Sequence, residues 1–79
     1  MNEQKIKSDS GILIGQNIRD IRMSKQIGQT ELVRLLQLHG ISITREAIVK
    51  IERGIQHIYA SQLKAIKDVL DTTYDELLK

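Results

Sequence analysis

The chain contains no cysteine and no proline, and it has two tyrosines but neither phenylalanine nor tryptophan. Without cysteine, a disulfide framework and a thiolate metal site are excluded, and an intracellular protein is the simpler expectation. The longest apolar runs, such as Ile12-Leu13-Ile14, are far shorter than the roughly 20 residues that span a bilayer. The N-terminus also lacks the hydrophobic region of a signal peptide. These absences predict a cytoplasmic protein without a membrane segment.

The shortage of aromatic residues restricts what can fill the core. Hydrophobic residues make up 41% of the 79 residues and aromatic residues only 3%, so the core must consist mainly of isoleucine and leucine. A chain of this length has room for one domain, which buries roughly 60–65% of the surface of the unfolded chain. The net charge of +2 is compatible with a nucleic-acid partner but does not require one. Composition therefore favours a small helical domain and leaves its partner open.

Three segments in the first two thirds of the chain have apolar residues at the spacing of an amphipathic helix. The first extends from Ser10 to about Lys25, and the second covers residues 29–39. The third follows Thr44, whose hydroxyl can accept a hydrogen bond from a free amide at the helix start, and it ends at Gly54. The pattern therefore predicts three short helices joined by turns.

The two ends of the chain differ in character. Residues 1–9 are polar and have no apolar period, which predicts a flexible N-terminal arm. After a loop at residues 55–60, a fourth helix is expected to begin near Ser61. Thr73 and Glu76 have the T-x-x-E form of a capping box, which predicts a short fifth helix. No segment shows alternation with period two, so strands are not expected.

Short strings in the first three helical segments carry a resemblance to a known family. Residues 14–78 are similar in order and spacing to the Cro and phage-repressor helix-turn-helix family, also called the xenobiotic-response-element family. The resemblance implies an all-α, five-helix, lambda-repressor-like domain over residues 10–79, in which the second and third helices form the helix-turn-helix. The matching strings are Ile18-Arg19-Asp20-Ile21-Arg22, Gln29-Thr30-Glu31-Leu32 and, most specific, Ile48-Val49-Lys50-Ile51-Glu52-Arg53-Gly54.

The chain departs from the family pattern at two places. Residues 38–43 replace a tight turn, so the spacing between Leu32 and Glu52 is roughly five residues longer than is common in the family. Gly28 stands where the family usually has a serine or threonine cap, and glycine caps nearly as well. The chain therefore resembles a longer-turn branch of the family that retains the recognition face.

The resemblance places the start of the third helix against the bases of the DNA major groove. Arg45 or Lys50 can donate to guanine O6 and N7, and Glu46 can accept from cytosine N4. Side chains and free amides at a helix N-terminus can bind phosphate. The alternative for all of these residues is a solvated surface without a partner. The expected base contacts are Thr44, Arg45, Glu46, Val49 and Lys50, and the expected phosphate contacts are Gln29, Arg53, Gln56 and His57.

The resemblance also implies an ion pair between Arg22 and Glu52, which joins the first helix to the third and has a structural role. His39 and His57 have no carboxylate at ligand spacing, so we expect neither a metal site nor a general base. No segment arranges a nucleophile, a base and an orienting residue, and no glycine-rich loop is present. We therefore expect no enzyme activity, no metal and no cofactor.

The expected partner is double-stranded operator DNA, bound by a transcriptional regulator, most simply a repressor. A homodimer is expected because one short helix contacts only a few base pairs. Dimerisation would use the fourth and fifth helices through Tyr74, Leu77 and Leu78, or these leucines instead close the core of the monomer. A second hypothesis is a protein-interaction module, such as an antitoxin or a phage protein that binds another regulator; an exposed apolar patch would favour it. RNA binding is a weaker alternative, because two tyrosines offer little base stacking.

Overall fold

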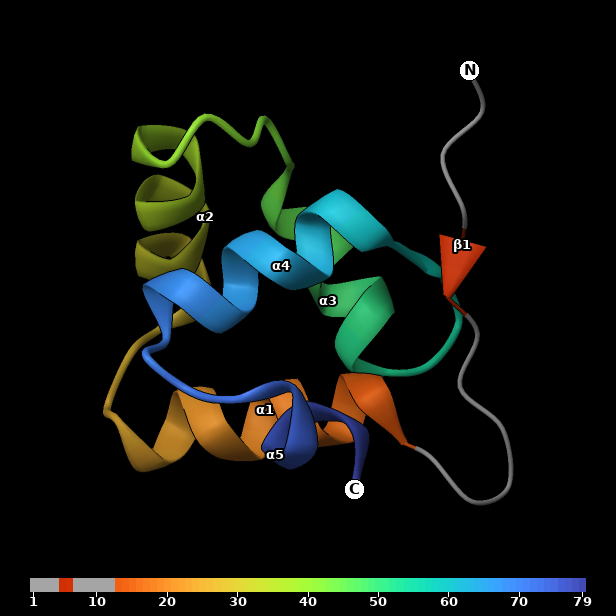
Figure 1. Ribbon diagram of the computed structural model, residues 1–79. Helices are drawn as coiled ribbons and strands as arrows, with labels where there is room; N and C mark the ends of the chain where they lie inside the picture. The colour runs from red at the N-terminus through yellow and green to blue at the C-terminus, as the bar shows by residue number, and fades with distance from the viewer. Residues whose placement is uncertain (1–4, 7–12) are drawn as a thin grey trace.

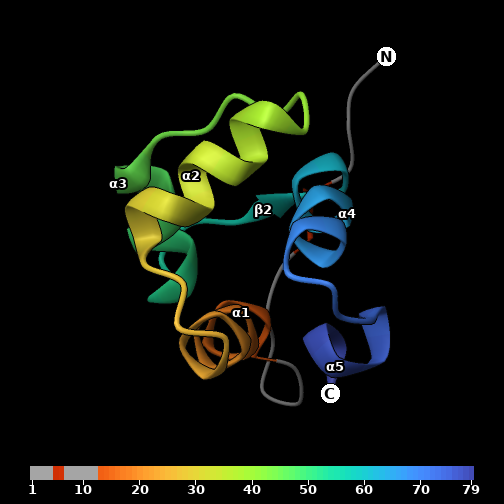
Figure 2. The ribbon, with the colours of Figure 1, turned by 90° about the vertical axis from the view of Figure 1, so that its left-hand side faces the viewer.

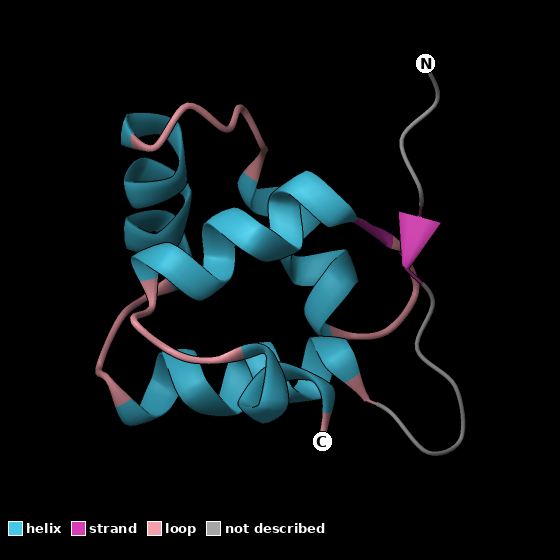
Figure 3. Ribbon diagram, viewed as in Figure 1, coloured by secondary structure: helices cyan, strands magenta, loops and turns pink. Residues whose placement is uncertain are grey.

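The computed structural model describes residues 5–6 and 13–79, most of which are helical (Figures 1 and 3). The described residues form five helices: α1 (Ile14–Ser24), α2 (Gln29–Leu38), α3 (Arg45–Glu52), α4 (Ala60–Val69) and α5 (Tyr74–Leu78). The expectation of a mostly helical fold is confirmed. None of the helices in this part of the chain has the length and apolar character needed to cross a membrane.

The expectation that the chain has no strands is wrong at one point. β1 (Lys5–Ile6) pairs antiparallel with β2 (Ile58–Tyr59), so that Ile6 lies opposite Ile58. Figure 2 shows β2 in the segment that leads into α4. Two-residue strands are too short to produce a pattern of period two, and the sequence therefore does not indicate them. Apart from β1, the expected arm at residues 1–9 lies outside the described residues.

The helix starts follow the capping signals of the sequence. Thr44 Oγ1 accepts from the amide of Ala47 at 3.0 Å at the start of α3, as predicted. Thr73 Oγ1 accepts from the amide of Glu76 at 3.1 Å and opens α5. The second bond of the capping box, in which the Thr73 amide would donate to the Glu76 carboxylate, is not formed within the described residues, and this carboxylate accepts from Lys79 Nζ at 3.0 Å. The capping box is therefore half realised.

The helices enclose one core of aliphatic side chains. α1 contacts α3 and α5, and α2 contacts α3 and α4; Figure 2 views α1 nearly along its axis, with α5 beside it. Leu77 of α5 is fully buried, so it closes the core of the monomer and is not available to a dimer surface. The core is dominated by isoleucine and leucine, as the composition predicts: Ile14, Ile18, Leu32, Leu36, Ile48, Ile51, Ile58, Leu63, Ala65, Ile66, Leu70 and Leu77.

The long turn between α2 and α3 is attached to the rest of the fold. Ile41 and Ile43 are partly buried and pack against the core. The amide of Ile41 donates to the carbonyl of Leu36 at 2.9 Å, which satisfies a carbonyl at the end of α2. The extra residues therefore help to position α3 through apolar contacts.

Two glycines determine how α3 is placed. At Gly15, α1 and α3 are so close that a Cβ atom would overlap the carbonyl oxygen of Ile51, and only glycine fits. Gly54 follows α3 with a φ of +77°, a conformation that favours glycine. This turn lets the amide of Ile55 donate to the carbonyl of Lys50 at 3.0 Å. Gly15 thus sets the spacing of the two helices, and Gly54 ends the second of them.

Candidate nucleic-acid interface

α3 has one face in the core and one face in solvent. Ile48, Ile51 and Glu52 are buried and form the inward face. The outward face is the one that the resemblance places against DNA bases. It consists of the exposed side chains of Arg45, Glu46 and Lys50 and the half-buried side chain of Val49. The structure thus brings these four predicted base-contacting residues together on one surface, which we call the outward face of α3.

The residues of the outward face differ in how freely they can bind a partner. Glu46 and Lys50 form an ion pair at 3.1 Å, one helical turn apart. The Arg45 guanidinium group has no ion-pair or hydrogen-bond partner among residues 13–79. Thr44 uses its hydroxyl oxygen as the acceptor that caps the helix, so its methyl group and its O–H donor are left for a base contact. Arg45 is therefore the most available hydrogen-bond donor of this face.

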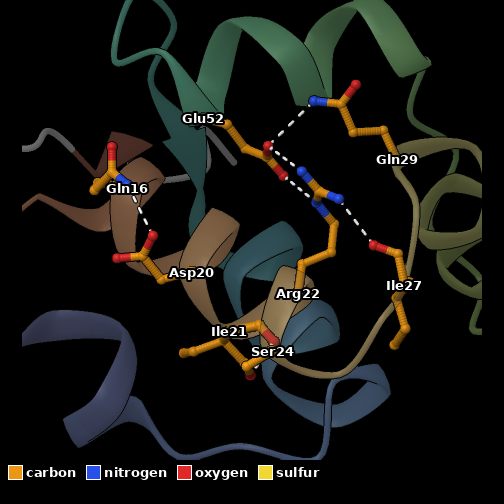
Figure 4. A network of polar contacts seen from close by, with 8 residues as sticks. All are labelled: Gln16, Asp20, Ile21, Arg22, Ser24, Ile27, Gln29 and Glu52. Carbon is orange, nitrogen blue, oxygen red and sulfur yellow. Dashed lines mark hydrogen bonds and ion pairs between the residues drawn. The ribbon is translucent and has the colours of Figure 1, made fainter.

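The C-terminal end of α3 is tied to α1 by a buried ion pair (Figure 4). Arg22 Nε lies 2.8 Å from Glu52 Oε2, and Arg22 Nη2 lies 2.9 Å from Glu52 Oε1. A third guanidinium nitrogen, Nη1, donates to the carbonyl of Ile27 at 2.8 Å. The hydrogen bond and the charge of Glu52 raise the pKa of Arg22 above its ordinary value, although burial opposes the shift. The structure thus joins the two residues for which the resemblance implied a pair.

Gln29, a predicted phosphate contact, belongs to the same network. Its Nε2 donates to Glu52 Oε1 at 3.1 Å, and its side chain is half-buried (Figure 4). Gln29 is the first residue of α2, so the network of Arg22, Gln29 and Glu52 joins three helices. The amide side chain is therefore held in place before any partner binds, a property that the sequence did not suggest.

An open cleft of about 460 Å³ lies next to this network. Two of its residues, Gln16 and Arg19 of α1, were not among the predicted site residues. A sequence signal for Arg19 existed, because it lies three residues before Arg22 and therefore on the neighbouring part of the same helix surface. We call this feature the arginine cleft, and its lining residues are Gln16, Arg19, Gln29, Val49, Glu52 and Arg53.

The other predicted phosphate contacts lie elsewhere. Gln56 and His57 are exposed in the loop between α3 and α4 and do not line the arginine cleft. His39, the second histidine, binds Asp68 Oδ2 through Nε2 at 3.2 Å. Within the described part of the chain, no three histidine, aspartate or glutamate residues are grouped so that they could hold a metal ion.

No family model, curated protein or solved structure matches the chain. The candidate interface is therefore defined by the chain's own residues: the outward face of α3 and the arginine cleft, which share Val49.

Proposed function

We propose that the chain is a sequence-specific double-stranded DNA-binding protein that regulates transcription, as a repressor, with α3 in the major groove. A single observation carries the proposal. The inward face of α3 is fixed by the core and by the buried pair of Arg22 and Glu52, while its outward face presents charged side chains to solvent. The major groove of B-DNA admits one α-helix, and base edges there are distinguished by hydrogen bonds from such side chains. We assign the chain no enzyme activity.

The chemistry of the outward face fits base recognition. Arg45 can donate two parallel hydrogen bonds to guanine, which is the commonest specific contact in the major groove. The pair of Glu46 and Lys50 must separate if the two residues are to contact different base pairs, and the exposure of both side chains keeps the cost of this separation low. Val49 offers an apolar contact for a thymine methyl group.

We further propose that two copies bind one operator, because α3 has only eight residues and contacts few base pairs. With Leu77 buried, the apolar side chains left on α5 are Tyr74 and Leu78, which are 41% and 36% exposed. These two residues are the surface through which we expect the copies to meet. A protein-interaction module would be favoured by a broader apolar patch on α4 and α5, and the burial of Leu77 weakens that alternative.

The proposal is tested by selecting bound sites from a pool of random duplexes. Wild type is expected to enrich one sequence with two symmetric half-sites about one helical turn apart. Arg45→Ala is expected to lose preference at one position of each half-site, at a cost of about 1–3 kcal/mol for that base. Lys64→Ala, an exposed lysine on α4, is the control and is expected to select the wild-type site. Identical sites for Arg45→Ala and wild type would contradict the assigned face, and the absence of any enriched site would contradict the proposed function.

A further inference from the structure

The arginine cleft joins two positive charges to the face that is proposed to contact bases. Arg19 comes from α1 and Arg53 follows the last residue of α3, and both are exposed. Neither guanidinium group has an ion-pair or hydrogen-bond partner within residues 13–79. Val49 lines the cleft and also belongs to the outward face of α3. A partner that lies along the outward face of α3 therefore meets both guanidinium groups in the adjoining cleft.

Glu52 supplies the one carboxylate among the residues that line the cleft, and its charge is neutralised, so it does not repel a bound anion. Glu52 lines the cleft, but its two oxygens accept three hydrogen bonds, from Arg22 Nε, Arg22 Nη2 and Gln29 Nε2. The charge of Glu52 is thus balanced by that of Arg22. Figure 4 shows Gln16 and Gln29 on opposite sides of Glu52. The Gln16 amide donates to Asp20 Oδ1 at 2.8 Å and the Gln29 amide donates to Glu52 Oε1 at 3.1 Å, so each NH2 group keeps one N–H for a further partner. Among the residues that line the cleft, the charge that remains uncompensated is positive, on Arg19 and Arg53, and a further carboxylate, that of Asp20, accepts the hydrogen bond from Gln16.

We propose that the arginine cleft holds one phosphate of the DNA backbone, shared between Arg19 and Arg53. The inference rests on the proposed function, because the phosphate belongs to the duplex whose bases lie against α3. A guanidinium group donates N–H bonds in a planar arrangement that matches phosphate oxygens. Since Arg19 and Arg53 come from different helices, one shared phosphate would fix the duplex relative to α1 and α3 at the same time. The contact sets orientation and does not distinguish bases.

Glutamine substitutions at the two arginines test the inference by salt titration on one duplex. Neutralising one phosphate contributes about 0.9 to the slope of log affinity against log salt, which corresponds to roughly eightfold in affinity at about 0.1 M salt. We expect Arg19→Gln and Arg53→Gln each to weaken binding to every duplex by several-fold. In the double variant, we expect the affinity to fall roughly eightfold in total and the slope of log affinity against log salt to decrease by about one, because both arginines bind the same phosphate. Lys64→Gln removes the same charge from α4 and is expected to change affinity by less than about twofold.

The outcomes separate the inference from the proposed function. Wild-type affinity and slope in Arg19→Gln would overturn the cleft as a phosphate site while leaving DNA binding in place. Additive losses with a slope change of about two in the double variant would overturn the shared phosphate. A wild-type protein that binds no duplex would overturn the proposed function itself. Because both arginines are exposed, thermal unfolding of the variants should match that of the wild type, which excludes misfolding as a cause.

Free phosphate is the other source of the same chemistry. NMR signals of the Arg19 and Arg53 Nε–H groups are expected to shift when duplex is added and to remain unchanged with inorganic phosphate at the same concentration. Saturation of both signals by inorganic phosphate alone would show a site for a small free anion and would overturn the inference.

Discussion

Two polar side-chain pairs of this chain, Arg22 with Glu52 and His39 with Asp68, each link one helix to another, and the two pairs differ in burial. Arg22 and Glu52 are 30 residues apart and link α1 to α3, with side chains that are 9% and 2% exposed. His39 and Asp68 are 29 residues apart and link the end of α2 to α4, with side chains that are 46% and 34% exposed. The first pair makes two short hydrogen bonds, and the second makes one of 3.2 Å.

The difference in burial decides what each pair does. In the buried pair, each charge depends on the other, because water cannot replace a missing partner. That pair therefore holds α3 in one orientation against α1. In the exposed pair, water solvates both groups whether or not they meet, so the contact adds little. The packing of α2 on α4 depends instead on apolar side chains such as Leu36 and Ile66, which are fully buried.

The largest effect is expected from breaking the buried pair. Glu52→Ala leaves the charge of Arg22 buried without a partner, which should cost about 3–5 kcal/mol of the free energy of unfolding. That is a large part of the roughly 4–12 kcal/mol available to a domain of this size. Urea denaturation measures the loss. DNA binding should weaken as well, without a change in the preferred sequence, because Glu52 contacts no base.

A double substitution distinguishes burial of a lone charge from loss of packing. Arg22→Met combined with Glu52→Leu leaves no charge buried, so it should be more stable than Glu52→Ala alone. If the double variant is the less stable of the two, packing and not the unpaired charge explains the loss.

The next largest loss of stability is expected where the backbones of α1 and α3 meet, at Gly15 and Ile51. Gly15→Ala places a Cβ atom on the carbonyl of Ile51, so α1 and α3 must move apart. The overpacking should cost about 1–3 kcal/mol, even though alanine favours the helix itself. Gly28→Ala is the control for the steric overlap, because its Cβ atom meets open space and the change only weakens the cap of α2, so it should cost less than Gly15→Ala. Equal unfolding midpoints for the two variants in urea would show that the close approach is not required.

Features that depend on neighbouring residues could be predicted from the sequence, and contacts between helices could not. The helices could be located because apolar spacing and the caps at Thr44 and Thr73 depend on neighbouring residues. The same spacing indicated that the third helix is amphipathic, and the family resemblance supplied the residues of its outward face. The bond from Gln29 to Glu52 could not be predicted, since it depends on how closely α1, α2 and α3 approach one another. The same holds for the arginine cleft, whose two guanidinium groups come from different helices.

The burial of Leu77 and the pairing of β1 with β2 are further examples of this limit. A leucine near the end of an amphipathic helix suits either a core or an interface, and only the position of α5 against α1 decides between them. A strand pair of two residues depends on contacts between distant segments and leaves no local pattern.

The smallest effect is expected from the exposed pair, and it should depend on pH. Burial raises the pKa of Asp68, but hydrogen bonds from Lys67 and His39 together lower it below its ordinary value. A carboxylate whose pKa is lower in the folded state stabilises the fold above its unfolded pKa, and this contribution disappears as the pH falls through the folded pKa. Asp68→Asn should therefore lower the melting temperature slightly at pH 6, less than Gly15→Ala does, and the difference from wild type should vanish in acid. Asp71→Asn, which removes the same charge from a residue whose side chain makes no ion pair within residues 13–79, is the control and should change the melting temperature at pH 6 less than Asp68→Asn does. A difference between Asp68→Asn and wild type that persists unchanged at the lowest pH would show that the carboxylate charge is not its cause.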